Sequence, residues 1–214
     1  MKKVLIAISL FSLSLNLTTA QIIDNLTLEL NLGRFSPETG IFSSGYYPNE
    51  FTYLNGFNIG YSNSEKWEYY VGVRKINSVI NSGDLYSLES ALKNGMEYRL
   101  GARVSPKNEK KVFLSYGLEL FGEFSNHRGT YWVDYPPTYE INHRRSYIGI
   151  APALTLNIKL VDRVSFFIES RYRYGRVNLM QQESTKRDYE LFRSREYWSG
   201  TFDLMNSIGV KFEL

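Results

Sequence analysis

The sequence predicts an all-β protein: an eight-stranded antiparallel up-and-down transmembrane β-barrel with short periplasmic turns and long external loops. Three observations support this fold class. Segment after segment alternates between apolar and polar residues, which is the period of an extended strand. The polar connections between these segments alternate between long and short. Charged residues also fall in mid-strand on one face, with aliphatic residues on the other, as in a wall between lipid and a polar lumen.

The clearest strand is the last one, over 198–214. Every second residue from Trp198 onward forms a nearly continuous apolar face, and this pattern also places Asn206 on that face. The opposite face carries Asp203 and Lys211. The stretch is much longer than an ordinary globular strand of about 5–6 residues, and its length favours a membrane-spanning strand.

The other seven strands are predicted from the same alternation. In chain order they cover 26–33, 51–61, 67–74, 96–104, 112–124, 148–158 and 164–174. Leu, Ile, Val and aromatic residues form one face of each segment, and polar residues and glycines form the other. The sixth segment contains Pro152, which cannot donate a ladder hydrogen bond, so we expect a β-bulge there.

The connections predict which end of the barrel is which. Long loops are expected over 34–50, 125–143 and 175–197, and short turns over 62–66, 105–111 and 161–163. Outer-membrane barrels have this asymmetry, with the short turns in the periplasm. The segment 76–94 is open to two interpretations: a loop, or a hairpin that extends two strands above the membrane around a turn at 81–84.

The N-terminus has the pattern of a secretory signal peptide. Two lysines directly follow Met1, an apolar run covers 4–17, and the segment ends in a small residue, Ala20. The run is shorter than the ~20 residues of a membrane-spanning helix. We therefore expect a signal peptide at 1–20 and one outer-membrane β-barrel domain at 21–214.

Composition excludes several classes of protein. Without its first two lysines the chain has 23 basic residues against 22 acidic ones, so it lacks the basic surplus of a nucleic-acid-binding protein. There is no cysteine, and hence no disulfide framework. The sequence contains no metal-ligand cluster or phosphate-binding loop, so no cofactor is expected.

The charged face determines what the interior would contain. Because eight strands leave a lumen only just wide enough for side chains, both signs of charge would pair across it. The predicted lumen ion-pair network consists of Glu29, Glu68, Arg74, Glu97, Arg99, Arg103, Glu119, Glu123, Glu169, Arg171, Arg173, Asp203 and Lys211. Aromatic residues near strand ends resemble the interfacial girdles of membrane barrels; they are Tyr53, Trp67, Tyr98, Phe124, Tyr147, Tyr174 and Trp198. The alternative is a secreted, soluble lipocalin-like ligand carrier with the apolar face turned inward.

The residues resemble the small outer-membrane barrels typified by the OmpA membrane domain and OmpX, and more closely the PorT-like "outer membrane protein beta-barrel domain" family. Three stretches carry this resemblance: 92–101, with its Glu-Tyr-Arg-Leu-Gly ending, the glycine-containing 111–122, and the closing strand 203–214. The resemblance implies an integral location in the Gram-negative outer membrane and recognition by the barrel-assembly machinery. Leu214 departs from the family pattern, in which the last residue is often aromatic.

Two groups of residues at the predicted external end are candidates for chemistry. A lipid-modifying hydrolase would need a nucleophile and a base in contact, and Ser125, His127 and Glu123 lie close in sequence. Guanidinium groups bind phosphate well, so Arg128, Arg144 and Arg145 are candidate contacts to lipopolysaccharide. Salt bridges within the loops explain the same arginines equally well.

The sequence therefore favours a non-enzymatic integral outer-membrane protein with a charge-paired, closed lumen. Its structural, adhesion or assembly role would be performed by the external loops or by a membrane partner. Outer-membrane lipids, including lipopolysaccharide, are the expected surroundings. The tyrosine-rich loops are also candidates for binding a protein partner, since Tyr is favoured at interfaces; their tyrosines are Tyr46, Tyr47, Tyr131, Tyr135 and Tyr139.

Overall fold

A computed structural model of the chain describes residues 25–35, 51–63, 66–83, 87–105, 111–133, 139–185 and 190–214. The predicted signal peptide and most of the predicted loop 34–50 lie outside these residues. The strands are β1 (Leu26–Phe35), β2 (Phe51–Ser62), β3 (Trp67–Gly83), β4 (Ser87–Val104), β5 (Val112–Val133), β6 (Tyr139–Val161), β7 (Val164–Thr185) and β8 (Glu190–Glu213). No described segment forms a helix long and apolar enough to cross a membrane.

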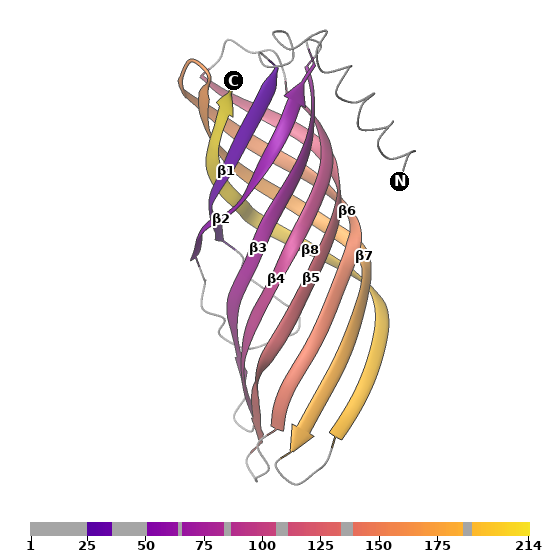
Figure 1. Cartoon of the computed structure of the whole chain (residues 1–214). Helices are drawn as coiled ribbons and strands as arrows, with labels where there is room; N and C mark the ends of the chain where they lie inside the picture. Colours follow the sequence, from indigo (N-terminus) through magenta and orange to yellow (C-terminus); the bar gives the residue numbers. More distant parts are fainter. Residues whose placement is uncertain are drawn as a thin grey trace, which may run out of the picture.

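The eight strands form one closed antiparallel barrel, which confirms the predicted fold class. Each strand pairs with its neighbours in sequence, and β1 pairs with β8 to close the cylinder (Figure 1). Thr27 lies opposite Glu213 in this closing pair, so the chain enters and leaves the barrel at the same end. We call this end the terminal end, and the opposite one the far end.

The barrel wall is much taller on one side than on the other. Pairing of β2 with β3 stops at Gly56 and Arg74, and pairing of β1 with β8 stops at Gly33 and Ile208. Beyond these positions β3 to β8 continue toward the far end while β1 and β2 stop short (Figure 1). In the described residues the far part of the molecule is therefore a curved six-stranded sheet rather than a closed tube.

Two predicted external loops are largely strand, so the sequence-based boundaries were wrong there. β5 and β6 pair continuously out to Tyr131 and Tyr139, and β7 and β8 pair out to Ser184 and Glu190. The physical reason is that water meets both faces of these extensions. Neither face needs to be apolar, so the alternation that marks a strand disappears although backbone pairing continues.

The uncertain segment 76–94 forms the extended hairpin rather than a loop. Gly83 pairs with Leu88, and the ladder between β3 and β4 is continuous from there to Trp67 and Val104. The turn expected at 81–84 is therefore placed too early, because residues 81–83 belong to β3. The short turn predicted at 161–163 is confirmed, and Arg163 has a φ of 67° there.

Pro152 does not produce the expected bulge. β5 pairs with β6 in one register through Pro152, which lies opposite Leu118. On the other side, Ile150 pairs with Tyr174 and Ala153 with Arg171, which is also a single register. The strand thus tolerates the missing N–H by a local gap in pairing with β7.

A register shift occurs instead in β8. Glu169 lies opposite Ser207 but Arg171 lies opposite Asp203, so two extra residues of β8 are accommodated between these pairs. The shift turns the side chain of Asn206 inward, where it is fully buried. The prediction that Asn206 lies on the outer face was therefore wrong, because strict alternation does not continue through a bulge.

Candidate functional site

The interior of the barrel is filled by charged side chains. All thirteen residues of the predicted network are buried, and Lys93 joins them, giving seven carboxylates and seven cationic groups among the described residues. Sequence reasoning missed Lys93 because 76–94 was not assigned to strands. The signal was present, since Lys93 shares the alternation phase of Glu97 and Arg99.

At the terminal end of the lumen, two basic residues converge on Glu68. The Arg103 Nε lies 2.8 Å from one carboxylate oxygen of Glu68, and the Lys211 Nζ lies 2.7 Å from the same oxygen. Arg103 also forms an ion pair with Glu29. These residues come from β1, β3, β4 and β8, so the contacts cross the barrel and join strands that are far apart in sequence.

In the middle of the lumen, Arg171 bridges two glutamates. Its Nη2 lies 2.5 Å from Glu97 and its Nη1 lies 3.0 Å from Glu119. Glu97 is shared with Arg74 at 2.8 Å, while Arg99 contacts Glu169 at 2.7 Å. A buried carboxylate without a partner would cost several kcal/mol, so this sharing of partners is what makes a charged interior stable.

Neutral side chains complete the central group. Asn206 accepts a hydrogen bond from Arg74 and donates one to Glu169, and Asn58 accepts one from Arg99. The hydroxyl of Tyr70 donates to Glu119 at 2.5 Å. None of these residues was predicted for the site. Asn206 could not have been found from alternation, because only the register shift in β8 brings it inside.

Gly101 provides the space that Tyr70 occupies. A Cβ added at Gly101 would lie 2.4 Å from the Tyr70 Cζ and 2.6 Å from its hydroxyl oxygen. We therefore expect Gly101→Ala to displace the hydroxyl from Glu119 and to lower the free energy of unfolding by about 1–3 kcal/mol. Chemical denaturation of the barrel in detergent would measure the change. Gly122→Ala is the matched control, since the nearest atom is the end of the Phe124 ring at 3.3 Å. Equal effects of the two substitutions would contradict this role of Gly101.

Toward the far end, Glu123 is surrounded by basic groups. Lys93 lies 3.0 Å away and Arg173 lies 2.7 Å away, and Arg173 also contacts Asp203 at 2.7 Å. Tyr147 packs beside this group, edge-on to Phe121 with a ring-centroid distance of 4.8 Å.

Tyr147 is fully buried, so its predicted place in the outer aromatic girdle was wrong. It alternates with Ile148, which faces outward, and must therefore face inward. The other described girdle residues are exposed, namely Trp67, Tyr98, Phe124, Tyr174 and Trp198. The side chain of Tyr53 lies outside the description, as do those of the five loop tyrosines.

The candidate hydrolase residues do not form a catalytic arrangement. The Ser125 hydroxyl lies 3.5 Å from the His127 Nε2 and also 3.5 Å from Glu123. A triad requires the acid to orient the histidine, but here the acid contacts the serine and is held by Lys93 and Arg173. Ser125 is also buried in the wall. The geometry does not favour hydrolysis.

The three candidate lipopolysaccharide arginines point in two directions. Arg128 and Arg144 are exposed on the outer face of β5 and β6. Arg145 faces inward, where its guanidinium lies 5.2 Å from the centre of the Tyr147 ring and 3.9 Å from Glu123. Arg144 and Arg145 are neighbours in β6, so their side chains point to opposite faces of the strand. The structure therefore separates Arg145 from Arg128 and Arg144.

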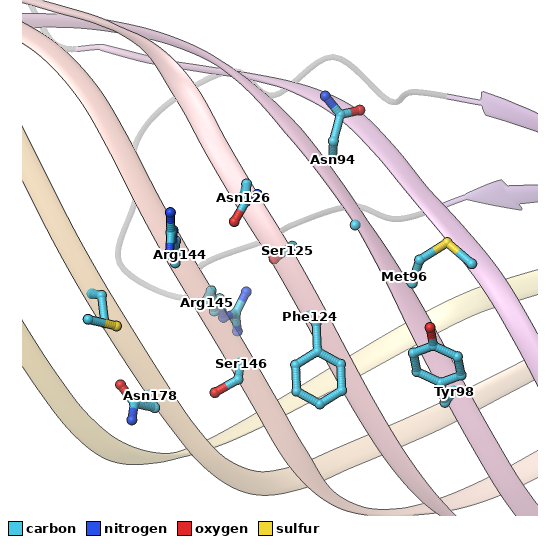
Figure 2. A pocket seen from close by; sticks show the side chains of 12 residues that line it. Asn94, Met96, Tyr98, Phe124, Ser125, Asn126, Arg144, Arg145, Ser146 and Asn178 are labelled. Carbon is cyan, nitrogen blue, oxygen red and sulfur yellow. The ribbon is translucent and has the colours of Figure 1, made fainter.

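A groove of about 510 Å³ crosses the outer face near Arg144 (Figure 2). Tyr98, Phe124 and Met96 line its apolar part, while Asn126, Ser146 and Asn178 belong to its polar part together with Arg144. The groove faces away from the ion-paired interior. Among the described residues, no group of three or more metal-ligating side chains is found.

Comparisons with known proteins support no family assignment. No protein-family model matches the chain, and no curated protein matches it. The chain is similar to the crystal structure of CarO from Acinetobacter baumannii, with 12% identity, a TM-score of 0.47, and coverage of 89% of this chain and 98% of that one. It is also similar to CarO2 from the same organism, with 9% identity, a TM-score of 0.48 and the same coverage.

A third similarity is to a much larger protein. The ferric yersiniabactin uptake receptor FyuA from Yersinia pestis matches with 10% identity and a TM-score of 0.38 over 69% of this chain. The chain spans 23% of the length of that receptor. At these identities and TM-scores none of the three similarities indicates a function, and the fold is established by the strand pairing itself. The resemblance to OmpA, OmpX and PorT-like barrels stays a prediction.

Proposed function

We propose that this protein is a non-enzymatic integral protein of the outer membrane, with a charge-paired and closed lumen. Its structural, adhesion or assembly role would be performed by the parts beyond the membrane or by a membrane partner. One observation carries the proposal: the polarity of the barrel is the inverse of that of a soluble protein. Charged groups fill the centre, while the large apolar side chains are exposed on the outside.

The outer surface has the composition expected for contact with acyl chains. Leu100, Leu118, Leu120, Ile148 and Phe202 each expose about half of their surface or more. In water such a continuous apolar surface would cause association. A lipocalin-like carrier needs the opposite arrangement, with an apolar cavity inside, and the described interior is charged. This observation favours the membrane protein over the carrier.

The interior also supports a closed lumen. In an eight-stranded barrel the inward side chains fill most of the available width. Here the central arginines and glutamates contact one another from β3, β4, β5 and β7, and Asn206 reaches the same group from β8. Passage of a solute would require these charge pairs to separate in a water-poor interior, which is unfavourable.

Two measurements test the proposal separately. We expect the protein to fractionate with the outer membrane and to migrate differently on a denaturing gel before and after boiling, because a closed barrel resists detergent until heated. Recovery in the soluble fraction would contradict the membrane location. Reconstituted in planar bilayers, the protein should give no conductance steps. Regular steps would show that the lumen conducts and would overturn only the closed-lumen part of the proposal.

A further inference from the structure

We propose that the outer groove of β4 to β7 binds the phosphorylated headgroup of a glycolipid of the lipid A class, with Arg144 as the phosphate-binding residue. This inference rests on the proposed membrane location. It names a specific lipid and a specific site, whereas the sequence indicated only arginines in or beside the external loops.

The register of the strands places the groove where the outer face changes from apolar to polar. Met96, Phe124, Ser146 and Asn178 lie in one row across β4 to β7, and all four line the groove. Tyr98 lies one step closer to the terminal end. This is the level at which a lipid headgroup would meet its acyl chains.

The next row, farther from the terminal end, is mainly polar. Asn94, Asn126 and Arg144 pair with one another across β4 to β6, and Met180 follows on β7. Figure 2 shows Asn126 and Arg144 on neighbouring strands to one side of Phe124, and the strand register places them toward the far end. The far end would face the outer leaflet, because the short turns between strands lie at the terminal end and outer-membrane barrels have their short turns in the periplasm.

The apolar part of the groove suits acyl chains. The rings of Tyr98 and Phe124 lie 6.3 Å apart with their planes inclined at 60°, and each is about half exposed. Aromatic residues at this level are typical of the membrane–water interface. Ile148, also exposed, continues the apolar surface toward the terminal end.

The charge of the groove favours an anion. Arg144 is exposed and lines the groove, and no acidic side chain is among the residues that line it. Glu196 on β8, an acid in the same outer face, forms an ion pair with Arg176 and accepts a hydrogen bond from Asn178. Lys75, exposed on β3 and opposite Met96, adds positive charge on the other side.

The polar side chains complement a phosphate. A guanidinium group can donate two parallel hydrogen bonds to phosphate oxygens. Asn126 and Ser146 supply further donors on the same face. A glycolipid whose phosphate lies toward the far end and whose acyl chains lie toward the terminal end matches both parts of the groove. Free phosphate would use only the polar part.

The test uses the full protein in lipid nanodiscs and measures retention of lipid A by native mass spectrometry. We expect Arg144→Gln to weaken retention about tenfold, the change expected for one charge-assisted hydrogen bond. Arg163→Gln, in the short turn at the terminal end, is the matched control and should retain lipid A normally. Equal retention by the two variants would overturn the proposal.

Two further arms identify the ligand. Wild-type protein should bind dephosphorylated lipid A as weakly as Arg144→Gln binds intact lipid A, and the variant should not distinguish the two lipids. Inorganic phosphate at millimolar concentration should not displace lipid A, because it lacks the acyl contacts. Displacement by phosphate would reject the glycolipid assignment. A protein that resides in the outer membrane but binds lipid A without dependence on Arg144 would refute this inference alone.

Discussion

Replacement of Arg171 by methionine is expected to lower the free energy of unfolding by about 3–5 kcal/mol, the cost of removing one partner from a buried ion pair. The Arg171 side chain is buried and contacts Glu97 at 2.5 Å and Glu119 at 3.0 Å. Methionine replaces the aliphatic part of the arginine side chain but leaves both carboxylates with one basic partner fewer. Denaturant-induced unfolding in detergent micelles would measure the loss of stability, with the gel mobility of unboiled samples used to monitor the folded fraction.

A second substitution distinguishes lost charge pairing from lost packing. Adding Glu97→Gln to Arg171→Met should cost less than the sum of the two single changes, because each removes the same interaction. Arg163→Met, in the exposed turn between β6 and β7, should change stability by no more than about 0.5 kcal/mol. If Arg171→Met were as mild as this control, the central ion pairs would not stabilise the barrel.

Introducing a charge on the outer face should be almost as destabilising, but only in a membrane. Leu118 lies midway along the apolar face of β5 and is 53% exposed. Leu118→Arg should cost about 2–4 kcal/mol in folding into phospholipid vesicles, whereas Ser146→Arg, at the level where the face becomes polar, should cost about 0–1 kcal/mol.

The direction of this difference tests the membrane location directly. In water, arginine at an exposed position such as Leu118 would be tolerated and would improve solubility. Equal folding of the two arginine variants into vesicles would therefore contradict a lipid-facing surface. The comparison uses the same introduced residue at two depths, so intrinsic preferences of arginine for a strand largely cancel.

The sequence predicted the strands correctly where the two faces of a strand carry different types of residue, apolar outside and charged inside. From Met96 to Val104 every second residue faces outward, as the alternation indicated. The alternation failed to predict the extensions of β5 and β7 toward the far end. Residues 126–130 and 178–184 have polar residues on both faces and yet continue as strands. It also failed at Pro152 and at Asn206, where the outcome depends on how a neighbouring strand pairs.

The candidate site was predictable in its composition but not in its contacts. Alternation assigned thirteen of the fourteen buried charged residues to the inner face, since this needs only the phase of each strand. It could not show that Arg171 bridges Glu97 and Glu119, because those residues come from three different strands. Nor could it separate Arg144 from Arg145, because both follow the predicted loop 125–143 and precede the predicted strand 148–158.

By itself, the sequence determined the number of strands and which face of each carries charge. These properties are local, because successive side chains of a strand point to opposite faces. The environment of each face then selects the type of residue found there. Only the tertiary structure decided which charges pair, how far the wall extends, and that Asn206 enters the lumen while Arg144 faces a groove outside. Those outcomes depend on register between strands, a long-range property that no single stretch of sequence encodes.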